Sequence, residues 1–117
     1  MLISEAASKS GLSTETIRYY ETVGIVPRVE RLPNGNRHFT TENVEWLTLL
    51  YWLRKTGMPI KVMQHFAKLY NQGDHTIPER KKILLEHQSR LEERRNNIDQ
   101  CSAILSHKLE IYRRFES

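Results

Sequence analysis

The residues best suited to chemistry form two short clusters of basic and aromatic side chains. Arg18, Tyr19 and Tyr20 are consecutive, and Arg37 lies two residues after an Asn-Gly pair. Guanidinium groups donate hydrogen bonds to phosphate oxygens and guanine edges, and tyrosine hydroxyls also contact phosphates. The two clusters therefore predict binding to a nucleic-acid backbone.

A short helix is expected to carry the first cluster. Ser13 suits the N-cap of this helix, where its hydroxyl accepts a hydrogen bond from a backbone amide, and Gly24 ends it. A shorter helix over residues 5–10, capped by Ser4 and ended by Gly11, is predicted to precede it. Two short helices joined by a glycine-containing turn predict a helix-turn-helix, whose second helix reads a groove of DNA.

The second cluster is expected on a two-stranded wing. Residues 29–32 and 37–39 flank Asn34-Gly35, a strong signal for a tight turn between paired strands. The predicted wing presents Arg37 near its base. The neighbouring His38 could contact DNA, but it is equally well explained as an exposed strand residue that binds nothing.

Two further helices complete the predicted head. Thr40 or Thr41 caps a third helix, with a glutamate at position 42 or 45 as its capping partner, and this helix runs to Gly57. Pro59 suits the first turn of a fourth helix, which Gly73 ends. The aromatic residues of the third helix either line an effector pocket or, as is more common, pack in the core.

From Thr76 and Pro78 onward, a single helix is predicted to reach the end of the sequence, because no further proline or glycine interrupts it. A row of apolar residues seven apart forms a seam, and a second, mostly polar row interleaves with it. A long helix with a narrow apolar stripe is expected to pair with a second copy. The predicted dimer contacts are Leu84, Leu91, Ile98, Cys101, Leu105 and Tyr112.

The predicted organisation is therefore mainly α, with a winged helix-turn-helix domain at residues 1–73. A connector and dimerisation helix follow at residues 74–117. The chain of 117 residues is too short for two full hydrophobic cores.

Composition narrows the function classes. Lys and Arg total 18 against 14 Asp and Glu, a net charge of +4, which permits an anionic partner without requiring one. A single cysteine and the lack of a signal-like or long apolar segment favour a soluble cytoplasmic protein without membrane contact.

No nucleophile, base and orienting group recur in a catalytic arrangement, and the five histidines lack tight ligand spacing. We expect no enzyme activity, metal or cofactor.

Each candidate DNA contact has a simpler alternative. Arg18 either meets a base edge or phosphate or is a solvated charge. Adjacent helical residues diverge by about 100°, so one of the two tyrosines can pack in the core, and Tyr20 is the preferred phosphate contact. Threonines near the helix start either touch bases or satisfy local backbone groups, and the lysines are nearly as well explained by solvation. The full predicted set is Thr14, Thr16, Arg18, Tyr19, Tyr20, Arg37, Phe39, Lys55 and Lys61.

The sequence resembles the MerR family of transcriptional regulators. The resemblance rests on Thr-Ile-Arg-Tyr-Tyr-Glu at residues 16–21, Gly-Ile-Val-Pro at 24–27, Asn-Gly-Asn-Arg-His-Phe at 34–39 and the helix junction at 53–60. It implies a dimer joined by an antiparallel coiled coil and bound to a pseudo-palindromic promoter. It further implies activation by distortion of the DNA, with RNA polymerase engaged indirectly through the promoter.

The connector at residues 73–80 is similar to the branch of that family that responds to aldehydes and nitrosative stress. Members of this branch usually place a cysteine two residues before the Arg54-Lys55 position, where this chain has Trp52. The resemblance therefore implies that a thiol sensor is absent from that position. Cys101 is better explained as a small apolar residue than as a redox sensor.

An alternative hypothesis is a helical adaptor that dimerises through its long helix and binds other proteins. Such an adaptor has no physical need for Arg37 behind an Asn-Gly turn, nor for Arg18 beside two tyrosines. The sequence therefore favours the DNA-binding regulator.

Overall fold

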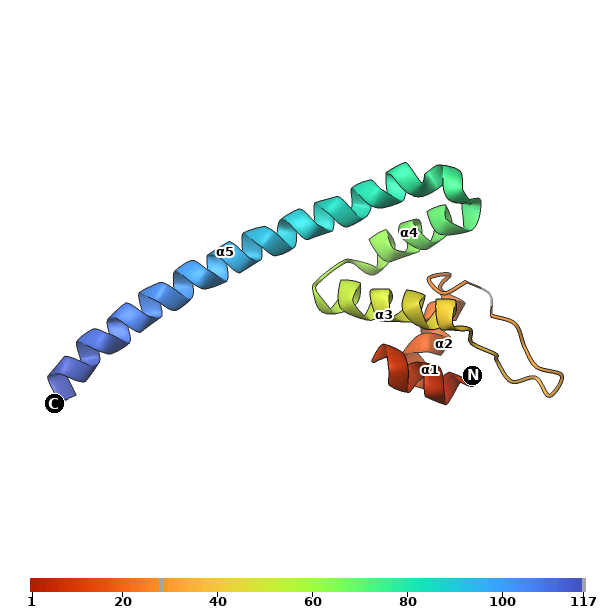
Figure 1. Ribbon diagram of the computed structural model, residues 1–117, viewed down its shortest axis with the longest axis horizontal. Helices are drawn as coiled ribbons and strands as arrows, with labels where there is room; N and C mark the ends of the chain where they lie inside the picture. Colours follow the sequence, from red (N-terminus) through yellow and green to blue (C-terminus); the bar gives the residue numbers. More distant parts are fainter. Residues whose placement is uncertain (28, 117) are drawn as a thin grey trace. The chain divides into compact units, whose positions relative to one another are not determined.

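The computed structural model describes residues 1–27 and 29–116, and its regular structure in this part is helical (Figure 1). The predicted mainly α class is confirmed. The helices, in order, are α1 (Ile3–Ser10), α2 (Thr14–Thr22), α3 (Thr41–Lys55), α4 (Ile60–Gln72), the short 3₁₀ helix η1 (Asp74–Thr76) and α5 (Ile77–Glu116). The chain divides into two compact units, residues 1–81 and a second that begins at Lys82.

Side-chain caps set the start of two helices. Ser13 caps α2 as predicted, since its Oγ accepts a hydrogen bond from the Thr16 amide at 3.0 Å. Thr40 caps α3, and its Oγ1 accepts from the Asn43 amide at 3.1 Å. Asn43 Oδ1 accepts in return from the Thr40 amide at 2.9 Å. The expected glutamate partner was wrong, because Asn43 holds the third helical position from which a side chain reaches back to the cap.

The predicted Ser4 cap of α1 is also wrong. The helix begins at Ile3, and Leu2 precedes it without a side-chain hydrogen bond. The Phe39 amide donates to the Met1 carbonyl at 2.7 Å. This backbone pairing fixes the chain just before α1 and allows the helix to begin earlier than the serine would indicate.

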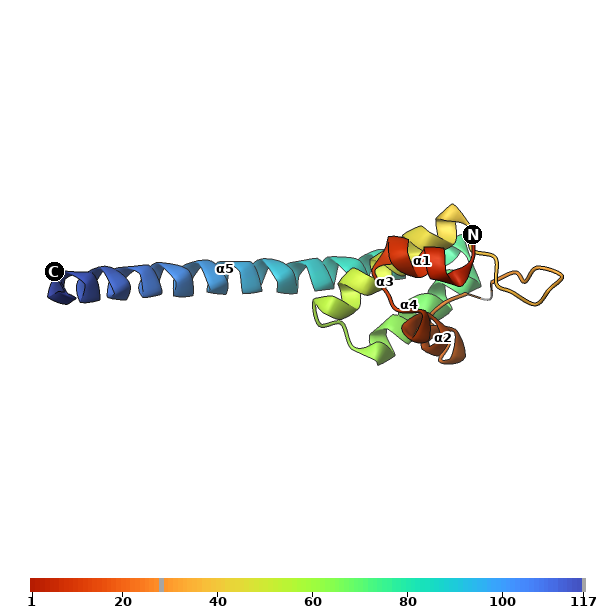
Figure 2. The ribbon, with the colours of Figure 1, turned by 90° about the horizontal axis from the view of Figure 1, so that it is seen from below.

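The core of the first unit forms where α1, α2, α3 and α4 meet. Helices α1 and α3 are in contact, as Figure 2 shows. Trp46 of α3 stacks on Phe66 of α4 with ring centroids 5.4 Å apart. Its indole N–H donates to the Ile25 carbonyl at 3.0 Å, which ties the loop after α2 to α3. The largest fully buried side chains are Ile17, Ile25, Phe39, Leu47, Leu50, Met58 and Met63.

The wing is a loop between α2 and α3 that extends away from the helices (Figure 1). In the described part of this loop, strand-like pairing is limited to one antiparallel bridge between Arg31 and Arg37, so the two-stranded prediction was too extensive. The pairing ends at Leu32, because the tight turn from Leu32 to Gly35 begins there and Pro33 occupies its second position, which proline suits. The turn itself forms as predicted, with Gly35 at φ +87° and its amide bonded to the Leu32 carbonyl at 2.8 Å.

The long helix predicted at the C-terminal end is confirmed as α5, which spans 40 residues. Several large apolar side chains along it are exposed in the single chain, including Ile98 at 66% and Leu105 at 57%. Ile104, Leu109, Tyr112 and Phe115 are exposed as well. Across the described residues, the helices include none that is both long and apolar enough to cross a bilayer.

Gly11 provides a test of how α1 and α2 are joined. It has φ +91°, and a Cβ built there meets the Tyr51 ring at 3.0 Å. Gly24 has φ +81° but open space around it. We expect Gly11→Ala to lower the free energy of unfolding by about 2–3 kcal/mol, and Gly24→Ala by about 1 kcal/mol, because only the first adds a clash to the backbone strain. Urea denaturation of the two variants checks this, and equal losses would contradict the close packing on Tyr51.

Candidate nucleic-acid interface

Helix α2 divides its side chains between core and solvent. Ile17 and Tyr20 are buried, whereas Arg18 and Tyr19 are exposed. Tyr19 is 52% exposed and Tyr20 only 3%, although their rings are 6.1 Å apart between centroids. The outward face of the predicted recognition helix therefore carries Arg18 and Tyr19. The sequence favoured Tyr20 over Tyr19 as the phosphate contact, whereas Tyr19 is the more exposed of the two side chains.

The two threonines at the start of α2 lie beside this face and are half-buried. Thr16 Oγ1 accepts a hydrogen bond from the Ser13 hydroxyl at 2.8 Å. Thr14 is the first residue of the helix. Local capping was the simpler explanation for the two threonines, but Ser13 is the residue that caps the helix. Contact between the threonines and DNA bases stays a prediction.

Arg37 joins the wing to the end of α2. Its Nε lies 2.6 Å from Oε1 of Glu21, and the two side chains are 21% and 18% exposed. Neither atom makes a well-aligned hydrogen bond, so charge attraction rather than a linear hydrogen bond holds the pair. Arg37 therefore fixes the wing against α2, and any DNA contact it makes comes from the remaining guanidinium nitrogens.

Phe39 ends the wing inside the core. Its side chain is 1% exposed, so it cannot present its ring to a ligand. This placement corrects the expectation that Phe39 contacts DNA. Its ring is instead part of the core, and its backbone amide donates to the Met1 carbonyl at 2.7 Å, which holds the end of the wing there.

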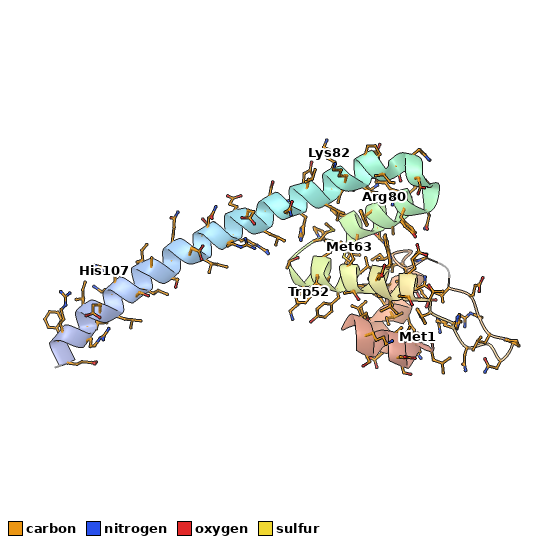
Figure 3. All side chains as sticks on the ribbon, in the orientation of Figure 1. Met1, Trp52, Met63, Arg80, Lys82 and His107 are labelled. Atoms are coloured by element: carbon orange, nitrogen blue, oxygen red, sulfur yellow. The ribbon has the colours of Figure 1, made fainter. Side chains whose placement is uncertain are left out.

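The two predicted lysines are exposed at the junction between α3 and α4. Lys55 Nζ donates to the Tyr51 hydroxyl at 2.9 Å and lies 5.6 Å from the Trp52 ring centroid. Trp52, near the C-terminal end of α3 in Figure 3, is 55% exposed. Lys61 lies in the first turn of α4. Lys55 is thus a positioned cation rather than a freely rotating one.

Two charged residues at this interface were not singled out from the sequence. Glu21 pairs with Arg37, and the signal available in the sequence was its negative charge just before the basic wing. Arg54 lies close enough to Tyr20 to affect its titration. Its position next to Lys55 in the sequence was the only hint.

Metal and thiol chemistry receive little support from the described side chains. Within residues 1–27 and 29–116, the His, Cys, Asp and Glu side chains form no group of three placed to hold a metal ion. Cys101 is exposed on α5 and makes no disulfide within the chain.

The pairing of Arg37 with Glu21 predicts a stability effect. We expect Arg37→Ala to lower the free energy of unfolding by about 1–2 kcal/mol, less than the about 3–5 kcal/mol of a fully buried pair, because solvent still reaches both side chains. Arg31→Ala on the same wing is the matched control, since Arg31 is exposed and bonds only locally to the Gly35 carbonyl at 3.0 Å. Thermal unfolding of both variants measures the difference. A loss no larger for Arg37→Ala than for Arg31→Ala would show that the ion pair does not stabilise the wing.

Comparison with known proteins agrees with this geometry. Residues 1–69 match the sequence profile of the MerR HTH family of regulatory proteins, and residues 44–108 match the profile described as MerR, DNA binding. The HTH-type transcriptional regulator AdhR of Bacillus subtilis is 35% identical over 91 residues, which cover 78% of this chain and 65% of AdhR. An uncharacterized HTH-type transcriptional regulator of Haemophilus influenzae is 44% identical over 77 residues, which cover 66% of this chain and 57% of the relative. In both alignments the chain spans less than two thirds of the relative's length.

Among solved structures, the chain is similar to HiNmlR, a MerR family regulator lacking the sensor domain, bound to promoter DNA. The TM-score is 0.85 at 34% identity, covering 97% of this chain and 90% of that one. The relatives named here are transcriptional regulators and not enzymes, in agreement with the prediction of no catalytic activity.

Proposed function

Because the chain belongs to the MerR family of helix-turn-helix regulatory proteins, we propose that it binds promoter DNA as a homodimer and regulates transcription from there. The observation that carries this proposal is the outward face of α2, where Arg18 and Tyr19 are exposed while Ile17 and Tyr20 hold the helix in the core. The promoter DNA bound by HiNmlR supports the same assignment. In this proposal residues 1–73 bind DNA and residues 74–117 join the two subunits.

The exposed apolar residues of α5 support the dimer. A single chain leaves Ile98, Leu105 and Tyr112 in water, each more than half exposed. Burying apolar surface contributes about 25 cal/mol per Å², so pairing of two such helices is favourable. A twofold dimer uses the same surface on both subunits and presents two heads to two half-sites. The proposed operator is therefore pseudo-palindromic.

We further propose that regulation works through the shape of the promoter. A dimer that holds two half-sites at a fixed separation imposes its own geometry on the duplex, and bending a site of this size costs about 1–10 kcal/mol. Contacts from α2 and the wing to the backbone offset that cost. RNA polymerase then responds to the altered promoter without being a direct partner, and the protein works in the cytoplasm where the promoter is.

The adaptor hypothesis is not favoured. An adaptor would leave unexplained why a wing is fixed to α2 by the Arg37–Glu21 pair beside an exposed arginine and tyrosine. It would also leave the match to a DNA-binding family without a role.

Selection of bound fragments from a genomic library by the purified full chain tests the proposal. We expect enrichment of fragments that share one inverted repeat. Arg113→Gln, which removes an exposed charge on α5, should select the same repeat and serves as a control for general charge effects. Fragments without a common repeat, or none above background, would exclude a sequence-specific dimeric regulator. The gene beside the selected site then indicates which process is regulated.

A further inference from the structure

A cleft of about 220 Å³ lies between the first half of α3 and the C-terminal end of α4. The described residues of its wall are Glu42, Glu45, Trp46, Leu49 and Tyr70. All of them belong to the first compact unit, residues 1–81. Pockets for drug-sized molecules have volumes of about 300–1,000 Å³, so a ligand of this cleft is small.

The apolar part of the wall is held in place by packing. Trp46 stacks on Phe66 and lies 4.6 Å from Tyr70 between ring centroids. Its indole N–H donates to the Ile25 carbonyl at 3.0 Å. Trp46, Leu49 and Tyr70 are each partly exposed. Trp46 therefore packs in the core and also lines the cleft, which offers a hydrocarbon chain a preformed contact surface.

The charge of the cleft comes from Glu42 and Glu45. Both side chains are exposed, and they lie three residues apart on α3, where like charges repel each other. Among the described residues, neither carboxylate forms an ion pair, and their one hydrogen bond is a long contact of 3.4 Å from the Tyr70 hydroxyl to Glu42 Oε1. The repulsion between the two carboxylates is therefore not offset by a described cation of the chain.

The tyrosine adds no further negative charge. Burial raises the pKa of Tyr70, and the charge of Glu42 acts in the same direction, so the hydroxyl is protonated at neutral pH. Arg80 lies over the Tyr70 ring at 5.3 Å from its centroid but is not part of the wall. The cleft thus carries two negative charges on a protein whose net charge is +4.

This wall suits an organic cation better than a metal ion. Ca²⁺ and Mg²⁺ prefer six or more oxygen ligands, whereas the described wall offers two carboxylates beside three apolar or aromatic side chains. An ammonium group on a short aliphatic chain matches both parts. Its N–H groups donate to carboxylates, and its chain fits against an apolar surface.

We propose that this cleft binds a small organic cation, an ammonium group that carries a short aliphatic chain. The ammonium group donates to Glu42 and Glu45, and the chain lies against Trp46 and Leu49. Binding relieves the repulsion between the two carboxylates and removes apolar surface from water. This inference goes beyond the proposed function, and its test requires no DNA.

Titration of the ¹⁵N-labelled full chain with n-butylammonium chloride at constant ionic strength tests the site. We expect the indole N–H signal of Trp46 to shift and saturate with a dissociation constant of about 1 mM, because few contacts are available. The indole signal of Trp52, which is outside the described wall, is the internal control and should not shift. n-Butanol and ammonium chloride each carry one half of the probe and should bind at least about ten times more weakly. Equal shifts with all three compounds would overturn the proposal.

Two substitutions in the full chain locate the cation. Glu45→Gln should weaken n-butylammonium binding by about fivefold or more, because one of the two carboxylates is lost. Glu93→Gln, which removes an exposed negative charge on α5, is the matched control and should leave the binding unchanged. Thermal unfolding of both variants shows that the fold is retained. An unchanged dissociation constant in Glu45→Gln would overturn the assignment.

A lysine side chain carries the same alkylammonium group, and sedimentation equilibrium distinguishes this second source. We expect Glu45→Gln to leave the oligomeric state of the full chain unchanged. A full chain that does not bind n-butylammonium would overturn the proposal. Weaker self-association of Glu45→Gln would in that case assign the cleft to a lysine of a second copy.

Discussion

Replacing Arg18 with alanine is expected to reduce operator affinity by at least 100-fold while changing the free energy of unfolding by less than about 0.5 kcal/mol. Arg18 is exposed on α2, and among the described residues its side chain makes no hydrogen bond or ion pair. A lost arginine contact to a guanine edge costs about 1–3 kcal/mol in each subunit, and the dimer loses two.

A gel shift at fixed salt and a urea denaturation curve together check this result. Lys9→Ala on α1 is the matched control, because it also removes one exposed positive charge, which pairs only with Glu5 at 3.5 Å. Its operator affinity should stay within about threefold of the parent protein. Equal weakening by both substitutions would mean that total charge, and not the face of α2, determines binding.

Placing a charge on the exposed seam of α5 is expected to have the second large effect. Ile98 is 66% exposed in the single chain and lies at the middle of the apolar row. Ile98→Asp would bury two carboxylates in the paired helices, which is costly without partners. We expect the variant to be monomeric at micromolar concentration and its operator affinity to fall by about 10²- to 10⁴-fold, because the two heads no longer bind as one unit.

Sedimentation equilibrium gives the oligomeric state directly. Ser89→Asp provides the control, because position 89 lies on the opposite side of the heptad from the seam and should leave the dimer intact. A dimeric Ile98→Asp protein would exclude pairing through the predicted seam. A monomeric parent protein would exclude the dimer altogether.

Local chemistry explains why most helices were predictable. Ser13 and Thr40 cap the helices that follow them through their own side chains, and Gly35 supplies the positive φ of the wing turn. These signals depend on neighbours in the sequence. The long α5 was predictable for the same reason, since nothing within it breaks a helix.

The site was less predictable because its contacts join distant segments. Arg37 pairs with Glu21 across the wing, and Arg54, at the far end of α3, lies close enough to Tyr20 to lower its pKa against the effect of burial. The choice between the two tyrosines also depended on the core. Ile17 lies three residues before Tyr20, and this spacing was the available signal that Tyr20 shares the buried face.

The contrast between the two tryptophans has a practical consequence. Trp46 is stacked on Phe66 and close to Tyr70, at 5.4 and 4.6 Å between centroids, whereas Trp52 is 55% exposed beside Lys55. Iodide in solution will therefore quench the fluorescence of Trp52 far more than that of Trp46. Because Lys55 is one of the predicted DNA contacts, the indole at position 52 is expected to report duplex binding without an added dye.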